Sequence, residues 1–182
     1  MADHSIKTIP AGMPLPVDDP NRSLTVATPD DPALPHIAQA GNIYTVLVSG
    51  AQTEGRYCLI DMLVPDGGGP PAHRHDFEEL FTLLEGELEF TFRGETQTVR
   101  APASVNIPAN APHRFANTSG SPVHMLCMCT PAGQEEFFLS VADPVSDRQA
   151  TPPALDDAAK AEKKALMQTL APTYRTEFLP QD

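Results

Sequence analysis

Two closely spaced histidines inside a glycine-bounded segment constrain this chain more than any other feature. His73 and His75 lie two residues apart in the segment 67–86, GGGPPAHRHDFEELFTLLEG, and Glu79 follows them. Residues two apart on a β-strand point to the same face, so both imidazoles would point the same way. Glu79 has the same parity, but a straight strand rising ~3.3 Å per residue would place it about 13 Å beyond His75. We therefore expect the chain to bend at residues 76–78 and to deliver Glu79 from the start of the next strand.

A third histidine, His113, follows in the sequence IPANAPHRFAN, and the chain has six histidines in all. Three neutral imidazoles and one carboxylate are typical ligands of a first-row transition metal. The sequence therefore predicts a metal site of His73, His75, Glu79 and His113. This set would leave coordination positions open, and it suits Fe, Mn, Ni, Co, Cu or Zn without choosing among them. The alternative is a surface pair of histidines beside an unrelated acid.

Residues 42–130 consist of short apolar runs separated by turn residues. The runs predict eight strands: Asn42–Val48, Arg56–Val64, Glu79–Leu84, Glu87–Phe92, Thr96–Arg100, Ser104–Ile107, His113–Asn117 and Val123–Thr130. Short strands with no long helix between them predict an all-β, antiparallel sandwich or barrel, and the jelly roll is the natural way to close it.

The two ends of the chain have different patterns. Residues 1–37 contain seven of the twenty prolines, which predicts an extended arm lying on the barrel or on a neighbouring subunit, with disorder as the alternative. The expected barrel covers residues 38–142. Residues 143–182 should form a linker and a C-terminal amphipathic helix packed on the barrel.

The predicted helix rests on apolar spacing and on a capping residue. Thr151 is the expected N-cap, ahead of two prolines that suit the first turn. The apolar face of the helix should consist of Leu155, Ala159, Leu166 and Leu170.

The residues around the histidines resemble the two motifs of the cupin superfamily. The first motif, G-x5-H-x-H-x3,4-E-x6-G, is filled at each fixed position by Gly67, His73, His75, Glu79 and Gly86. The second, G-x5-P-x-G-x2-H-x3-N, is matched at Pro108, His113 and Asn117. Pro102 and Asn110 stand where that motif has glycine. Asparagine tolerates a positive φ better than most residues, so Asn110 is a mild departure.

Segments outside the motifs resemble the quercetin 2,3-dioxygenase-like branch of small, single-domain cupins. They are residues 39–57, 129–138 and 171–180. This resemblance implies a jelly-roll β-barrel and an oxygen-dependent oxidoreductase of dioxygenase type, acting on a small hydroxylated substrate that can be aromatic. It also implies that Glu79 is both a metal ligand and the catalytic base. The alternatives are a metal-dependent isomerase or lyase on the same site, or a non-catalytic cupin that binds a small molecule or a metal.

For several residues the sequence allows two different roles. Five apolar residues could form either the wall of a substrate cavity or plain core: Phe81, Phe90, Phe92, Phe115 and Met125. Cys127 and Cys129 share one face of a strand, which favours small core residues over thiolate ligands. Glu78 has the opposite parity to Glu79 and should point away from the metal, as should His124 if Met125 points inward.

Charge and cysteine content limit the partners and the compartment. The net charge of −12 argues against binding to nucleic acid or to an anionic membrane. Three cysteines without a C-x-x-C motif, no long apolar run and no signal sequence predict a cytoplasmic protein. Exposed edge strands and an extended arm favour a homodimer, with a small molecule as the other expected partner.

Overall fold

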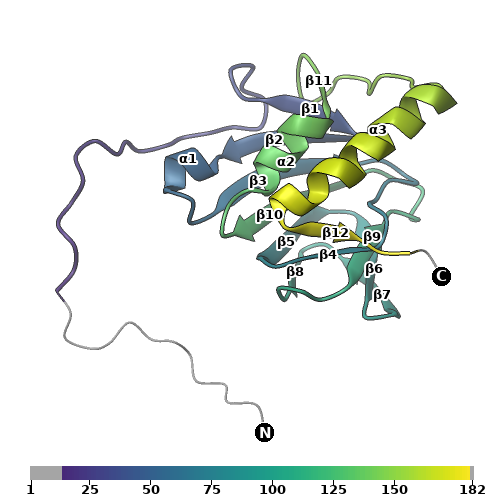
Figure 1. Cartoon of the computed structure of the whole chain (residues 1–182), viewed down its shortest axis with the longest axis horizontal. Helices are drawn as coiled ribbons and strands as arrows, with labels where there is room; N and C mark the ends of the chain where they lie inside the picture. Colours follow the sequence, from purple (N-terminus) through teal and green to yellow (C-terminus); the bar gives the residue numbers. More distant parts are fainter. Residues whose placement is uncertain (1–13, 181–182) are drawn as a thin grey trace, which may run out of the picture.

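Two antiparallel sheets form the body of the protein in the computed structural model, which describes residues 14–180. The larger sheet contains seven strands in the order β11 (Asp143–Pro144), β1 (His36–Gln39), β2 (Asn42–Val48), β3 (Cys58–Val64), β10 (Val123–Thr130), β5 (Glu78–Glu85) and β8 (Ala103–Ile107). The smaller contains β12 (Thr176–Phe178), β4 (His73–His75), β9 (His113–Ala116), β6 (Glu87–Phe92) and β7 (Glu95–Arg100). Figure 1 shows the two sheets and the helices beside them.

All eight predicted strands are present, with ends that agree within two residues. The architecture is consistent with the predicted jelly roll. The strand pairings form two separate sheets, so closure into a barrel stays a prediction. Within residues 14–180, four further strands are present. β4 was expected only from the spacing of its two histidines, and β1, β11 and β12 were missed because they are short and lie at or near the sheet edges, where few residues set a pattern.

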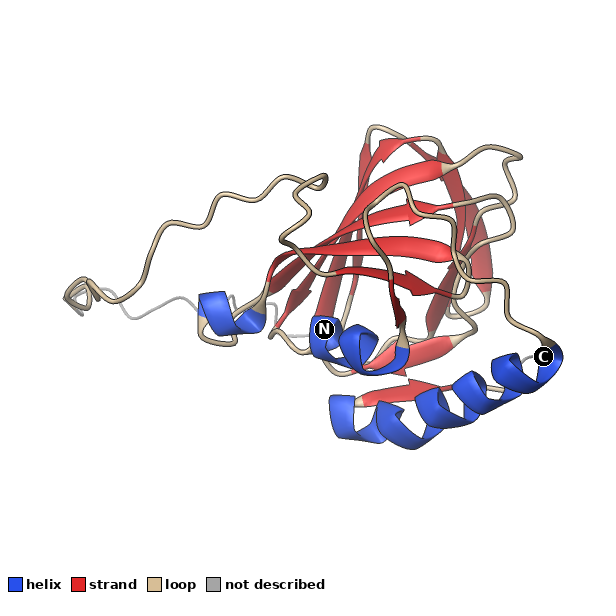
Figure 2. Cartoon of the chain, turned by 90° about the horizontal axis from the view of Figure 1, so that it is seen from above, coloured by secondary structure: helices blue, strands red, loops and turns tan. Residues whose placement is uncertain are grey.

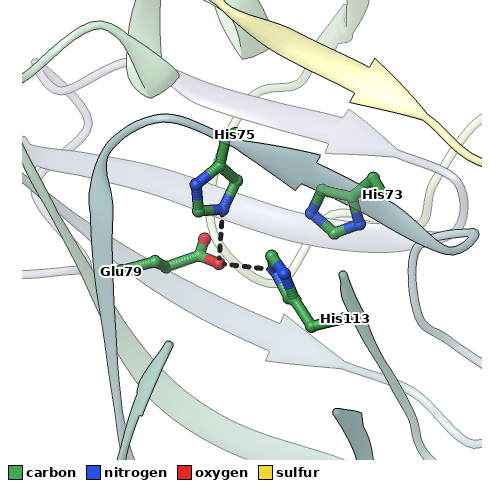
Figure 3. A group of neighbouring side chains, drawn as sticks. All are labelled: His73, His75, Glu79 and His113. Carbon is green, nitrogen blue, oxygen red and sulfur yellow. Dashed lines mark hydrogen bonds and ion pairs between the residues drawn. The ribbon is translucent and has the colours of Figure 1, made fainter. Parts of the chain in front are cut away.

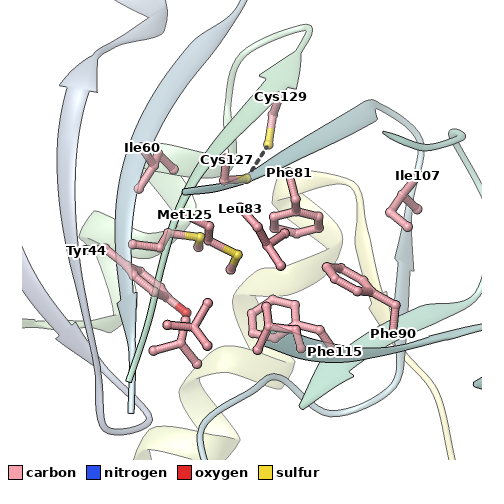
Figure 4. Close-up of a cluster of buried hydrophobic side chains, with 14 of the residues drawn as sticks. Tyr44, Ile60, Phe81, Leu83, Phe90, Ile107, Phe115, Met125, Cys127 and Cys129 are labelled. Carbon is pink, nitrogen blue, oxygen red and sulfur yellow. Dashed lines mark hydrogen bonds between the residues drawn. The ribbon is translucent and has the colours of Figure 1, made fainter. Parts of the chain in front are cut away.

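The core lies between the sheets and follows the two-residue period of the strands. Along β10 every second residue is buried, starting from Val123, and β5 alternates in the same way. Three phenylalanines, Phe81, Phe90 and Phe115, meet with ring centroids 5.5–6.0 Å apart (Figure 4). Burying each ring stabilises the fold by roughly 1.5–3 kcal/mol.

Within the described residues, three α-helices and one 3-10 helix accompany the sheets. They are α1 (Gly50–Thr53), α2 (Gln134–Val141), α3 (Asp157–Leu170) and η1 (Ala171–Tyr174). The pair α2 and α3 lies on one side of the sheets, next to β12 (Figure 2). Phe137 and Val141 of α2 form a small second core with Ala171, and Met167 of α3 packs against it. No helix within residues 14–180 is long and apolar enough to cross a membrane.

The C-terminal helix is present, but two details of its prediction are wrong. It begins at Asp157 because Asp156, not Thr151, caps it: Asp156 Oδ1 accepts a hydrogen bond from the Ala159 amide at 2.8 Å. Leu166 is 42% exposed, and Met167 faces inward instead.

The inward face of α3 is half-buried rather than buried. It consists of Ala159, Lys163, Met167 and Leu170. Lys163 fits there because its aliphatic stem packs while its ammonium group pairs with Asp143. A stripe drawn from apolar residues alone includes Ala159 and Leu170 correctly, but it omits this lysine and takes Leu166 in place of Met167.

The described part of the proline-rich arm, residues 14–35, contains no helix or strand and is largely exposed. Figure 1 shows it extending away from the sheets. Arg22 ties it to α1, since its guanidinium donates to the carbonyl of Gln52 at 3.1 Å. Residues 1–13 of the predicted arm lie outside the described residues. The predicted boundaries at residues 38 and 143 fall on strands of the larger sheet, because β1 begins at His36 and β11 at Asp143.

Candidate metal centre

The four predicted ligands come together from both sheets (Figure 3). His73 and His75 lie on β4, and His113 lies on the adjacent β9, where its Cα is the register partner of His73. Glu79 is the second residue of β5 in the other sheet. The chain crosses from one sheet to the other at residues 76–77, between β4 and β5. The predicted bend is therefore confirmed, and it is what brings the carboxylate beside the imidazoles.

Main-chain carbonyl groups fix the protonation of all three imidazoles. Each Nδ1 lies 2.9 Å from a carbonyl oxygen: His73 from Pro71, His75 from Phe77, and His113 from Ala111. A carbonyl oxygen can only accept, so each Nδ1 carries the proton and each Nε2 of a neutral ring presents a lone pair. The Phe77 ring also stacks on His75, with centroids 3.8 Å apart and planes 2° apart.

The lone pairs point at a common centre together with the carboxylate. Oε2 of Glu79 lies 3.1 Å from Nε2 of His75 and 3.1 Å from Nε2 of His113. Two acceptor atoms approach one another so closely only with a cation between them, which can be a proton or a metal ion. Ligands ~2.1 Å from one ion are about 3.0 Å apart at right angles and about 4.2 Å apart when opposite. The two separations of 3.1 Å match neighbouring ligands, and the four ligand atoms lie within 4.8 Å of one another, so the group could hold a metal ion.

Burial sets the charge of the ligands. All four side chains are buried, with at most 7% of any residue exposed. Burial and the neighbouring His113 lower the pKa of His73 from 6.5 to about 4, so this imidazole is neutral at neutral pH. Burial alone would raise the pKa of Glu79, but the contacts with His113 and His75 outweigh it and hold that pKa below its usual value. Neutral imidazole and ionised carboxylate are the forms that bind a metal.

Two backbone positions place the loops around the site. Gly69 has φ of 146°, and a Cβ atom there would lie 2.2 Å from the carbonyl oxygen of Phe115, just after His113 on β9. Asn110 has a positive φ of 67°, in keeping with its place at a glycine position of the motif. Its main-chain N–H donates to the carbonyl oxygen of His75 at 2.6 Å. Both contacts hold loops against histidine-bearing strands.

Two thiols contact the carboxylate from β10. Sγ of Cys127 lies 3.3 Å from Oε1 of Glu79, and Sγ of Cys129 lies 3.9 Å from the same oxygen. The contact with Cys129 lowers the pKa of Cys127, but burial and the charge of Glu79 raise it to about 12. The thiol is therefore protonated and donates to Glu79 rather than acting as a thiolate ligand. Both cysteines are buried and free, as predicted, but their contact with Glu79 was missed.

Two other candidates lie outside the site, as predicted. Glu78 points away from the histidines and accepts a hydrogen bond from Asn106 at 3.1 Å. His124 faces away from the metal centre and lies 2.5 Å from the buried Asp61, which also pairs with Arg148 at 2.8 Å.

A small cavity of about 60 Å³ adjoins the metal centre, and His73 and Glu79 are part of its wall. Phe81 and Phe115 line it as well, whereas Phe90, Phe92 and Met125 do not and belong to the core. Sequence reasoning missed the wall residues supplied by distant segments, including Tyr44, Met62, Phe137, Phe138, Met167 and Phe178. The last four come from α2, α3 and β12, which cover the cavity.

The fold and the ligand set can be compared with those of known protein families. Residues 60–129, which include all four candidate ligands, match the family described as Cupin domain. This match and the ligand set support the cupin superfamily. It is 28% identical over 113 residues to an uncharacterised protein of Methanocaldococcus jannaschii, covering 61% of this chain and 90% of that protein. It is 29% identical over 130 residues to the polyketide synthase CurC of Streptomyces cyaneus, covering 70% of this chain and 79% of that protein.

A solved structure agrees with the cupin fold. The crystal structure of a predicted oxalate decarboxylase from Thermotoga maritima superimposes with a TM-score of 0.53 at 17% identity, covering 59% of this chain and 99% of that one. Such low identity shows the fold alone. These findings support the cupin superfamily, and the quercetin 2,3-dioxygenase-like branch stays a prediction.

Proposed function

We propose that this cupin is a metal-dependent enzyme, a dioxygenase-type oxidoreductase acting on a small hydroxylated substrate. The observation that carries the proposal is the placement of a three-histidine, one-carboxylate set on the wall of a cavity. A structural zinc site is usually closed by four ligands and rich in cysteine. Here His73 and Glu79 line a cavity that a substrate can enter. Four protein ligands would also leave one or two coordination positions of a five- or six-coordinate ion open to that substrate.

The residues of the chain have separate parts in the proposed chemistry. When bound, a transition metal supplies a Lewis acid and a centre for electron transfer. The imidazoles hold it, and Glu79 accepts the proton of a substrate hydroxyl, since its carboxylate is ionised and lies on the cavity wall. Cys127 holds the other carboxylate oxygen, which leaves Oε2 directed toward the histidines. Aromatic side chains around the cavity limit the access of water.

A redox-neutral reaction is the second candidate. The same ligands would polarise a carbonyl or enediol in an isomerase, decarboxylase or lyase. The buried hydroxyl of Tyr44 on the cavity wall favours this alternative, because burial raises its pKa and keeps it protonated, so that it can donate a hydrogen bond to a substrate oxygen. The Thermotoga maritima structure is that of a predicted decarboxylase, in keeping with such chemistry on this fold.

The deciding experiment measures metal and dioxygen together. We expect about one equivalent of a redox-active metal by plasma mass spectrometry in chelator-free protein, and its loss in His113→Ala. Consumption of dioxygen with a hydroxylated substrate would support the oxidoreductase, whereas turnover without consumption would support the redox-neutral reaction. Protein without metal after reconstitution would contradict both and leave a non-catalytic binding module.

We also propose a cytoplasmic homodimer. Three free, buried cysteines suit a reducing compartment. Four apolar side chains of the arm are 80–94% exposed, namely Leu15, Val17, Leu24 and Val26. Apolar residues gathered on an extended segment suit docking onto a second copy of the chain.

A further inference from the structure

Three buried amide side chains around the cavity have an oxygen atom without a hydrogen-bond partner. Within residues 14–180, the buried side-chain nitrogen and oxygen atoms that lack a partner are Gln39 Oε1, Asn42 Oδ1 and Gln134 Oε1. All three residues line the cavity that His73 and Glu79 also line. Each is at least 95% buried. An unpaired buried acceptor destabilises a fold, so three of them on one wall indicate a ligand that donates to them.

The orientation of Gln39 is fixed by its neighbour on α3. Its Nε2 donates to the sulfur of Met167 at 2.9 Å. A thioether accepts hydrogen bonds but cannot donate them, so the nitrogen belongs on that side. The oxygen is therefore the free end of this amide.

The amide of Asn42 contacts the hydroxyl of Tyr44, a group that can both donate and accept. Its Nδ2 donates to the hydroxyl oxygen of Tyr44 at 3.2 Å. Its Oδ1 lies where a Cβ on Gly68 would come within 2.5 Å, so the glycine leaves room for this oxygen.

Gln134 is positioned by the start of α2. The next residue, Glu135, is buried and accepts a hydrogen bond from the amide of Gly50 at 2.6 Å. This contact ties the first turn of α2 to α1. The three amides thus come from β1, β2 and α2, and each is held by packing that does not use its oxygen.

We propose that the cavity binds a small aliphatic molecule with hydroxyl or amine donors at one end and a metal-binding oxygen at the other. The second half of this statement rests on the proposed function. Carbonyl oxygens of amides accept from O–H and N–H groups and disfavour a carboxylate or phosphate placed against them. The volume of about 60 Å³ compares with the ~10–15 Å³ that a cavity needs to hold one water molecule, so the cavity admits only a small molecule. The amide oxygens on the wall accept hydrogen bonds, and the cavity is small. Both features favour an α-hydroxy carbonyl compound over an aromatic substrate.

Hydroxyacetone and 2-butanone test this inference, because they have nearly the same shape and only the first has a hydroxyl donor. Their dissociation constants are measured by NMR titration of zinc-loaded and metal-free protein. The variants are Gln39→Met and Gln134→Met, with Gln97→Met on the exposed part of β7 as the matched control.

We expect hydroxyacetone to bind about tenfold more tightly than butanone to the wild type, and each cavity variant to lose most of that preference. Gln97→Met should keep it. The melting temperature of each metal-free cavity variant should equal or exceed that of the control, because an unpaired buried acceptor is removed.

Three results would overturn the inference: equal binding of the two compounds, no saturable binding of hydroxyacetone, or an undiminished preference in both cavity variants. A lower melting temperature in both variants would also overturn it, since the amides would then be satisfied structural groups. Zinc content is measured in the same samples. A donor preference in protein that takes up no zinc would sustain the amide site and refute the proposed metal chemistry.

Discussion

Sγ of Cys127 lies 3.3 Å from Oε1 of Glu79, while the other carboxylate oxygen faces the imidazoles of His75 and His113. The thiol thus orients a metal ligand from β10, the neighbouring strand of the same sheet. A partner of this kind typically contributes about 10–100-fold to metal affinity, and a thiol is a weak donor. We therefore predict that Cys127→Ala weakens zinc binding by about tenfold, measured by competition with a chromophoric chelator.

Cys58→Ala is the matched control for Cys127→Ala. Cys58 is equally buried in the same core on β3 and makes no hydrogen bond to Glu79. Both variants should lose roughly 1–2 kcal/mol of unfolding free energy through the lost packing. Equal zinc affinity in the two variants would show that the thiol of Cys127 contributes packing only.

The lowered pKa of His73 predicts how stability depends on pH. In the unfolded chain this imidazole has a pKa of 6.5, whereas burial and His113 bring it to about 4 in the folded protein. Between these values the unfolded state binds more protons, so acidification favours unfolding. The free energy of unfolding of metal-free protein should fall from pH 6.5 to about pH 4, by up to about 3 kcal/mol from this group.

Urea unfolding at a series of pH values checks this expectation. The His73→Gln variant lacks the titrating group and should show a shallower decline over the same range. An identical decline in both proteins would assign the acid sensitivity to other residues.

Neutralising Glu79 should separate metal binding from turnover. Glu79→Gln keeps an oxygen donor for the ion but cannot accept a proton. We predict that it retains most of the metal while turnover falls about 10²–10⁴-fold, the usual contribution of a general base. Glu78→Gln controls for charge and position, since Glu78 points away and bonds Asn106. Full activity in Glu79→Gln would refute the role of Glu79 as base.

The loop at Gly69 should tolerate no side chain. A Cβ there would lie 2.2 Å from the carbonyl oxygen of Phe115, at a φ of 146° that only glycine adopts freely. Gly69→Ala should therefore cost more than about 3 kcal/mol of stability and disturb His113 on the same strand. Gly67 also has a positive φ, but the space around it is open. Gly67→Ala should therefore lower the free energy of unfolding by only about 1 kcal/mol. Similar melting temperatures for the two variants would contradict this account of the loop.

The exposed apolar residues of the arm predict its part in assembly. Replacing Leu15, Val17, Leu24 and Val26 by serine should convert a dimer to a monomer in light scattering at micromolar concentration. Serine at Leu84 and Leu166, each 42% exposed elsewhere on the surface, provides the control. An unchanged molar mass in the arm variant would show that the arm does not hold the dimer together.

The strands and the ligand set could be predicted because both depend on short-range spacing. Alternation of apolar residues determines a strand such as Val123–Thr130, and the positions of His73, His75 and Glu79 require a bend between them. The helix face was predicted correctly at Ala159 and Leu170 but omitted Lys163, which is half-buried through its ion pair with Asp143, a residue distant in sequence. The first residue of the helix was predicted wrongly because two residues that can cap a helix, Thr151 and Asp156, lie close together in the sequence.

The amino-acid sequence by itself determined which residues can hold a metal and that the chain forms antiparallel sheets. Those properties follow from residue type and local period, which the sequence states directly. Only the tertiary structure decided what surrounds the metal site: the thiol of Cys127 behind Glu79, and the unpaired amides of Gln39, Asn42 and Gln134 on one cavity wall. The reason is that these groups come from β1, β2, β10 and α2. Their meeting depends on strand order and helix docking, and neither has a signature in local sequence.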